Sequence, residues 1–447
     1  MRNIKVFSLA YNYLHLLKTK WIETKVLRRL KHIENLPEEV LYQNQSKLLI
    51  DILSYAYNNT EYYKQIFKEN NIEATSIKDL KNIPFLTKEI IKKHTKELIS
   101  KEYGIESLGK RNTGGSTGEP LEFYCDTRAG LLDYGHHTYL YSLMGYKKGD
   151  YVLSCGGIEI DKNLREHNIY WLENRRGNVF GDFRFSVLYL NDSNINIYVQ
   201  KLISIQPAIL RGYPSFFHRL ACYILDHDIK LNFKIKGINL TSEMCSTEQR
   251  ITIEKAFSAM VYFEYGHNEV SLYCYTKDKT YTYQSSPIYG YIEVLNDDGT
   301  DTKIGEVGNI IATGFNNHGM PFIRYKTGDL GEISYRNGGI VHFSKIYGRT
   351  QDYILTKDNQ KVFLTPLIFG QHLKAFANIT KWQIYQDKIG EIDINIVKGK
   401  DFTEDDELDI LQSINSVTDI KINFNYVKNI ALTKRGKHLF LIQKLKH

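Results

Sequence analysis

The stretch Asn112-Thr-Gly-Gly-Ser-Thr-Gly-Glu-Pro120 places glycines, hydroxyl side chains and consecutive backbone amides in one short segment. Glycine permits positive φ and lets a ligand approach the backbone closely, and the hydroxyls add donors beside main-chain N–H groups. Such a loop can wrap a phosphate, which indicates a nucleotide enzyme. It is not the P-loop signature, because Glu119 stands where that signature requires lysine. The alternative is a plain glycine-rich turn before the strand-like Leu121–Tyr124.

Four further motifs follow this loop along the chain. They are Tyr265-Gly-His-Asn-Glu269, Tyr325-Lys-Thr-Gly-Asp329, Gly348-Arg-Thr-Gln-Asp352 and Thr433-Lys-Arg-Gly-Lys437. Each is weak alone, since a segment such as Tyr325–Asp329 is typical of a strand followed by a turn. In this order, the five motifs resemble those of the adenylate-forming superfamily, which contains acyl-coenzyme A synthetases, nonribosomal adenylation domains and luciferases.

The closer resemblance is to the phenylacetate-coenzyme A ligase family and, within it, to the capsule-biosynthesis group. It covers most of the chain and includes Ile83-Pro-Phe-Leu-Thr-Lys88, Arg211-Gly-Tyr-Pro-Ser215 and Thr241-Ser-Glu243. The resemblance implies an α/β fold. A large N-terminal adenylate-forming domain of mixed sheets and helices would be followed by a small, mobile α+β domain.

The length and patterning of the chain support two domains. A chain of 447 residues exceeds what one ordinary core holds. Residues 1–100 are expected to be mostly helical, and beyond them short apolar runs such as Tyr151–Ser154 alternate with helical patterns such as Pro214–Leu225, which favours α/β layers. A hairpin is expected over Glu332–Phe343, with its turn at Asn337-Gly338. The pattern restarts near Gln351, with a helix expected over Pro366–Ala377, so we predict domains at 1–350 and 351–447.

Composition limits the class of protein. Hydrophobic residues make up 42% and charged residues 24%, as in ordinary globular proteins. The net charge of +7 is spread along the chain, so we expect no nucleic-acid partner; attraction of ATP, coenzyme A or an anionic membrane surface fits equally well. The N-terminus shows no leader or long apolar run, which predicts a cytoplasmic protein without a membrane span. Five scattered cysteines predict free thiols and no structural metal.

The resemblance implies roles in nucleotide binding. The glycine-rich loop would hold the β- and γ-phosphates of ATP, Tyr265 would lie against adenine, and Asp329 would accept hydrogen bonds from the ribose hydroxyls. Arg349 would bind ribose or phosphate. The set assigned to the nucleotide is Thr113, Gly114, Gly115, Ser116, Thr117, Gly118, Ser242, Glu243, Tyr265, Gly266, Asn268, Asp329 and Arg349.

Two residues carry the expected catalysis. Glu269 would be the Mg²⁺ ligand, because a hard cation takes carboxylate and phosphate oxygens together. Lys437 follows a glycine that allows a tight turn, and the resemblance makes it the cation that bridges the substrate carboxylate and the α-phosphate. In this superfamily the C-terminal domain then rotates about the Gly-Arg motif. Gln351 and Asn268 depart from the usual hinge residue and threonine of the family.

The expected reaction is ATP-dependent activation of a carboxylic acid and transfer of the acyl group to coenzyme A, an amine or a sugar hydroxyl. The acyl pocket, expected around Tyr134–His137, Arg211–Phe217 and Ile238–Glu243, contains histidine and arginine. This favours a polar acid, such as an amino acid or sugar acid of an envelope polysaccharide. The alternatives are an aryl-coenzyme A ligase and a non-catalytic nucleotide-binding partner in polysaccharide assembly. For His267 and the pair His136-His137 we expect substrate-pocket or packing roles rather than metal binding.

Overall fold

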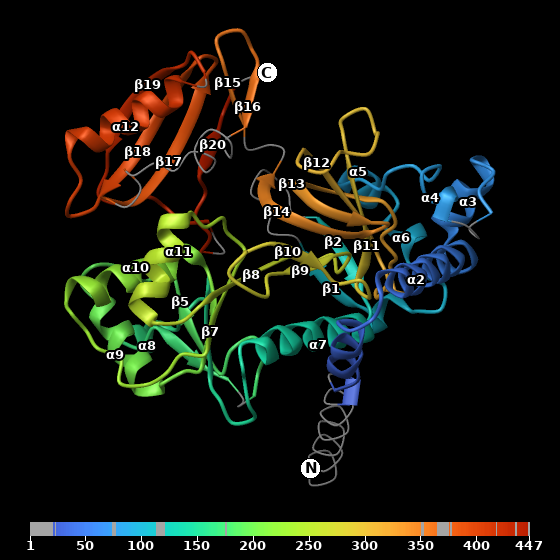
Figure 1. Cartoon of the computed structure of the whole chain (residues 1–447), viewed down its shortest axis with the longest axis horizontal. Coiled ribbons are helices and arrows are strands. Elements are labelled where there is room, and N and C mark those ends of the chain that lie inside the picture. Colours follow the sequence, from blue (N-terminus) through green and yellow to red (C-terminus); the bar gives the residue numbers. More distant parts are fainter. Residues whose placement is uncertain are drawn as a thin grey trace. The chain divides into compact units, whose positions relative to one another are not determined.

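The structure of the protein is a computed structural model (Figure 1). It describes residues 21–22, 24–73, 77–112, 121–174, 177–349, 353–363, 375, 378–416, 418–433 and 436–445. The chain divides into two compact units. The first contains residues up to 146 together with 264–327 and 331–346, and the second contains residues 147–263, 328–330 and those from 347 onward.

Helices begin the first unit. Residues 24–33 are helical, and in the next helix Leu49, Ile52, Leu53 and Ala56 are buried at helical spacing, as expected for an amphipathic helix packed on a core. Thr60 ends this helix and caps the following one, since its Oγ1 accepts a hydrogen bond from the Tyr63 amide. The helices are α2 (Glu38–Asn59), α3 (Glu61–Glu69), α4 (Ile77–Leu80), α5 (Lys88–Lys93), α6 (Thr95–Leu98), the 3-10 turn η1 (Ile105–Ser107) and α7 (Thr127–Leu143).

Strands complete the first unit. A hairpin of β1 (Gly109–Asn112) and β2 (Glu122–Cys125) precedes α7. A sheet follows in the order β11-β12-β13-β14-β10-β9-β8, and the turn predicted at Asn337-Gly338 joins β13 to β14. The strands are β8 (Val261–Gly266), β9 (Tyr273–Tyr275), β10 (Tyr283–Ser285), β11 (Gly290–Leu295), β12 (Val307–Gly314), β13 (Tyr325–Asn337) and β14 (Ile340–Arg349). All lie wholly or mainly in this unit except β8, whose first half belongs to the second unit.

The second unit contains a mainly parallel sheet in the order β7-β6-β3-β5-β4. Strands β3, β5, β6 and β7 are parallel, and only the edge strand β4 runs the other way. Every residue of β3 is buried, as expected for a strand covered on both faces. The elements are β3 (Val152–Gly156), α8 (Lys162–Glu166), β4 (Trp171–Glu173), β5 (Phe183–Ser186), α9 (Ile195–Ile205), β6 (Ile209–Gly212), α10 (Pro214–Asp226), β7 (Gly237–Thr241) and α11 (Thr247–Phe257).

The C-terminal part of the second unit has its own small core. Its four-stranded sheet has the order β19-β18-β17-β20, and α12 lies across it (Figure 1). Ile410 and Ile414 of α12 share a buried cluster with Ile384 and Ile394 of the sheet. The elements are the hairpin β15 (Tyr353–Leu355) and β16 (Lys361–Phe363), then β17 (Ile379–Lys388), β18 (Glu391–Lys398), α12 (Glu404–Asn415), β19 (Lys421–Tyr426) and β20 (Leu441–Gln443).

The fold is α/β, with an α+β arrangement after residue 353, as the sequence predicts. The boundary predicted at Gln351 lies outside the described residues and stays a prediction, as does the helix expected over Pro366–Ala377, of which only Ala375 is described. The compact units group residues 353–445 with 147–263. In the described part of the chain, no helix combines the length and apolar character needed to cross a membrane.

Candidate active site

The glycine-rich loop itself is not described. Thr113, Gly114, Gly115, Ser116, Thr117 and Gly118 all lie outside the described residues, so their contact with phosphates stays a prediction. The strands on either side of the loop are described. They pair in antiparallel register with Asn112 opposite Glu122, which brings the two ends of the loop together.

Asn268 joins the second motif to the strand that enters this loop. Its side-chain amide donates to the Asn112 carbonyl over 3.1 Å, and its own carbonyl accepts from Arg111 Nη1 over 3.3 Å. Gly266 and Asn268 are exposed, while Tyr265 is half-buried against the core beneath β9 and β11. Two motifs that lie far apart in the sequence are therefore adjacent in the first unit.

Glu269 is a buried carboxylate held by two neighbours. Tyr325 Oη donates to Glu269 Oε1 over 2.8 Å, and His267 Nδ1 lies 3.3 Å from Oε2 without forming a hydrogen bond within the described chain. Burial raises the pKa of Glu269, but the charge of His267 and the hydrogen bond from Tyr325 outweigh burial, so that the pKa lies below its usual range. Glu269 is therefore ionised at neutral pH.

A buried, ionised carboxylate fits Mg²⁺, which is usually bound through one or two carboxylates and the phosphates of its substrate. Consistent with this, the described residues hold no group of three or more His, Cys, Asp or Glu side chains arranged for a metal. Glu269 would hold the ion in the manner expected from the sequence, with the remaining positions left for phosphate and water.

Non-glycine residues beside the motifs have left-handed backbone conformations, among them Arg324, directly before Tyr325, with φ of 50°. Val270, directly after Glu269, has φ of 56°, and Ser242, directly before Glu243, has φ of 72°. A β-branched residue such as valine is strained in this region, and strained residues cluster at functional sites. The sequence pattern does not predict these backbone conformations.

Asp329 and Arg349 lie on neighbouring strands. Asp329 is half-buried in β13, and Arg349 is the last residue of β14, its side chain lying outside what the structure describes. Their contacts with ribose remain predictions.

Lys437 lies on a tight turn at one edge of the parallel sheet of the second unit. The turn is closed by hydrogen bonds from the Lys437 amide to Thr433 Oγ1 and from the Thr433 amide to the Lys437 carbonyl. Gly436 has φ of 72°, and a Cβ atom there would lie 2.8 Å from Gly157 Cα and 2.2 Å from a methyl group of Val187. The glycine predicted to shape this turn is therefore required both by its φ and by its close packing.

The neighbours of this turn follow the carboxyl ends of parallel strands. Gly157 follows β3, Val187 follows β5 and Glu243 follows β7. Glu243 Oε1 accepts a hydrogen bond from the His438 amide over 2.8 Å, and Oε2 accepts one from the Ser215 amide over 3.2 Å. Ligands of open α/β sheets bind outside the carboxyl ends of the strands, so Lys437 stands where such a ligand is expected.

His438 anchors the same turn to the C-terminal sheet. Its Nε2 lies 2.6 Å from the Trp382 carbonyl, which makes Nε2 the protonated nitrogen, and its ring packs edge-on against Phe440. Burial lowers the pKa of His438 to about 4, so the ring is neutral at physiological pH. The two neighbours of Lys437, Gly436 and His438, are therefore both held by contacts with distant parts of the chain.

The histidine pair on α7 lies in a buried polar network in the first unit. His137 Nδ1 lies 3.0 Å from Glu264 Oε2, Tyr289 Oη donates to Asp133 over 2.7 Å, and His136 Nε2 lies 3.0 Å from Ser286 Oγ. Glu264 directly precedes Tyr265. The network fits a packing or substrate-pocket role for the two histidines, and Glu264 and Asp133 are members that the sequence pattern did not single out.

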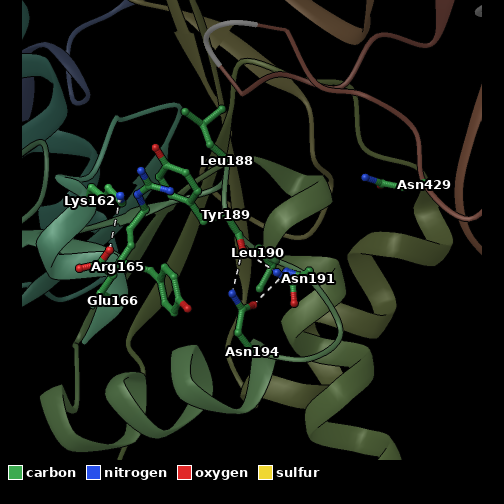
Figure 2. A pocket seen from close by; sticks show the side chains of 10 residues that line it. Lys162, Arg165, Glu166, Leu188, Tyr189, Leu190, Asn191, Asn194 and Asn429 are labelled. Carbon is green, nitrogen blue, oxygen red and sulfur yellow. Dashed lines mark hydrogen bonds and ion pairs between the residues drawn. The ribbon is translucent and has the colours of Figure 1, made fainter. Parts of the chain in front are cut away.

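The second unit also contains an open pocket of about 560 Å³. Figure 2 shows Lys162 and Arg165 of α8 on one side and Asn429 on another. The Arg165 guanidinium lies 4.7 Å from the centre of the Tyr189 ring, and Asn194 donates to the Tyr189 carbonyl over 2.8 Å. Two cations, the carboxylate of Glu166, amides and an aromatic ring line the pocket, and Glu166 lies 3.7 Å from Lys162 Nζ. This lining suits a polar ligand.

The chain is similar in sequence to known proteins, both in its C-terminal part and over most of its length. Residues 354–444 match the family described as the CapK C-terminal domain. The chain is 26% identical over 445 residues to the protein CapK of Staphylococcus aureus, covering 95% of this chain and 96% of that protein. It is 24% identical over 389 residues to phenylacetate-coenzyme A ligase of Pseudomonas putida, covering 81% and 82%.

Solved structures give the same fold. The crystal structure of 2-hydroxyisobutyryl-CoA ligase in the postadenylation state, in complex with R3-HIB-AMP, superimposes with a TM-score of 0.69 at 15% identity, covering 91% of this chain and 89% of that one. The chain has the fold of this ligase. In sequence it is similar to CapK and to the phenylacetate-coenzyme A ligases, which confirms the resemblance that the five motifs carry.

Proposed function

We propose that this adenylate-forming ligase activates a carboxylic acid with ATP and Mg²⁺, in the cytoplasm, to form an acyl-adenylate and pyrophosphate. The observation that carries the proposal is the place of Lys437, on a closed turn at the carboxyl edge of β3, β5 and β7. A mobile surface lysine would need no such docking. The proposal is supported by the ionised, buried Glu269 in the other unit.

The reaction brings two anions together. The substrate carboxylate attacks the α-phosphorus of ATP, the new acyl–phosphate bond forms, and the bond to pyrophosphate breaks. Lys437 would lie between the carboxylate and the α-phosphate and offset the charge that builds up in the transition state. Mg²⁺, held by Glu269, supplies Lewis-acid neutralisation of the phosphate oxygens when bound. Asp329 would orient the ribose, and Tyr265 would lie against the adenine.

We propose coenzyme A as the acceptor of the acyl group. The relatives named for a coenzyme A ligase activity support this. The pocket of the second unit is the candidate acceptor site, because Arg165 in its lining suits a phosphate of coenzyme A. Arg165→Ala should raise the KM for coenzyme A and leave adenylation unchanged. An unchanged KM would remove the pocket from the acceptor site.

The acid is proposed to be polar and to serve a capsular or other envelope polysaccharide. Similarity to CapK over 95% of the chain supports the pathway, and the charged network of His137, Glu264 and Asp133 on and beside α7 supports polarity in the acyl pocket. The similarity to phenylacetate-coenzyme A ligase favours an aryl acid as the second candidate. A screen of acids by exchange of labelled pyrophosphate into ATP separates these candidates, and a protein inactive with every acid would be a non-catalytic nucleotide-binding member.

A further inference from the structure

The resemblance assigns Glu243 to the nucleotide, but in the structure its side chain accepts hydrogen bonds from the protein backbone. Both carboxylate oxygens are engaged by backbone amides: Oε1 by His438 and Oε2 by Ser215. The two amides come from segments that are far apart in the sequence. Ser215 opens α10 in the α/β sheet region, and His438 follows Lys437 in the C-terminal part, 195 residues from Glu243.

We propose that Glu243 is a positioning residue that holds the backbone of Gly436–His438, and with it Lys437, in place for adenylation. The inference rests on the proposed adenylation function and assigns the side chain of Glu243 to the turn rather than to the nucleotide.

The geometry explains why this contact controls Lys437. The backbone of the turn is fixed on one side by Gly436, which packs against Gly157 and Val187. On the other side it is fixed by the hydrogen bond between the His438 amide and Glu243. Lys437 is the single residue between these two fixed points, so releasing either point frees the backbone that carries its ammonium group.

The surroundings of Glu243 also suit this role. Burial raises the pKa of Glu243 above its usual range, and the amides of His438 and Ser215 and the charge of Lys437 offset this rise only in part. A carboxylate that accepts backbone N–H bonds forms stronger bonds than a neutral amide would. The charge of Lys437 is also attracted to the Glu243 carboxylate, which binds the backbone amide of the next residue, His438.

A first test needs no substrate. Hydrogen exchange at the His438 amide is followed in the full-length protein and in Glu243→Gln, in which one of the two backbone donors must face an NH₂ group. We expect exchange at His438 to be faster by about tenfold or more in the variant, as for a lost bond to a charged acceptor. Unchanged exchange at His438 would overturn the proposal.

A matched control separates this effect from general loosening. Glu254 Oε1 accepts a bond of the same kind from the Val261 amide over 2.8 Å, in the same unit but away from Lys437. Glu254→Gln should speed exchange at Val261 and leave exchange at His438 as in the wild type. Equal acceleration at His438 in both variants would assign the effect to lost stability and overturn the proposal.

A second test uses the acid that gives pyrophosphate exchange with the wild type. Glu243→Gln should lower kcat for exchange by about tenfold or more, with the Kd for ATP and Mg²⁺ within about twofold of the wild type, because a positioning residue acts on the transition state. A rise in that Kd that accounts for the whole loss would assign Glu243 to the nucleotide instead. If the wild type exchanges with no acid, the proposed function fails, while the His438 measurement still decides the contact.

Discussion

The two regions that the motifs identify are built in different ways. The Tyr265–Glu269 segment in the first unit has contacts of both kinds: Glu269 lies beside His267, two residues earlier, and also accepts a hydrogen bond from the distant Tyr325. The Lys437 turn in the second unit depends on Gly157, Val187 and Glu243, which are all distant in the sequence. Glu269 therefore keeps one partner from its own motif, whereas the position of Lys437 depends on contacts with distant parts of the chain.

The largest effect is expected at Lys437. Lys437→Ala should lower the rate of adenylation by about three orders of magnitude, because removal of a preorganised charge acts mainly on the transition state. Calorimetry should find ATP binding nearly unchanged. Lys428→Ala, which removes an exposed lysine from the same part of the chain, serves as the control and should behave as the wild type. Equal losses in both variants would contradict a specific role for Lys437.

Glu269 is expected to give the next largest effect, with a different signature. Glu269→Gln should lower adenylation by about two orders of magnitude and raise the Mg²⁺ concentration needed for half-maximal rate, since a neutral amide is a weaker ligand for a hard cation. Lys437→Ala should leave that concentration unchanged. Mg²⁺ titrations of both variants check this difference. An equal shift of the half-maximal Mg²⁺ concentration in the two variants would contradict separate roles for Glu269 and Lys437.

Gly436→Ala tests the distant contact by sterics alone. The new methyl group meets Gly157 backbone and Val187 and must adopt positive φ, so we expect adenylation to fall by about tenfold to a hundredfold as Lys437 is displaced. Gly390→Ala is the control, because Gly390 also has positive φ and close packing, at Lys357, but is remote from the Lys437 turn. It should lower the melting temperature and spare adenylation. The reverse pattern would contradict the account.

The smallest effect concerns pH. Burial, followed by the charge of Arg219, lowers the pKa of Lys381 to about 8. The folded state therefore binds fewer protons than the unfolded state between about pH 8 and the unperturbed pKa of lysine, so this group makes stability rise with pH across that window. Denaturant titrations of Lys381→Met should lack this component. An identical pH dependence in wild type and variant would show that Lys381 is not buried as described.

Sequence reasoning predicts much of this fold. The buried run of β3, the helix after Pro214 and the turn at Asn337-Gly338 follow from local pattern, because period, proline and glycine act on the chain directly. The parallel order of β5, β3, β6 and β7 does not follow, because it depends on which strands meet after the helices pack.

The candidate site can also be predicted only in part from the sequence. Glu269 and Lys437 were identified because their motifs resemble those of a family. The contact between Glu243 and the His438 amide could not be predicted, since a carboxylate in sequence does not reveal which amide it will meet. Glu264 and Asp133 were missed for the same reason, because only the folded first unit places them near His137. The left-handed φ of Val270 is likewise a product of tertiary constraint.

The measurement that tests the central claim most directly is acid-dependent exchange of labelled pyrophosphate into ATP, made with the wild type and Lys437→Ala side by side. We expect exchange by the wild type that requires Mg²⁺ and one class of polar carboxylic acid, and its loss in the variant while both proteins bind ATP. Exchange by Lys437→Ala at the wild-type rate would contradict the account, because the turn docked against Glu243 and Gly157 would then hold no catalytic cation.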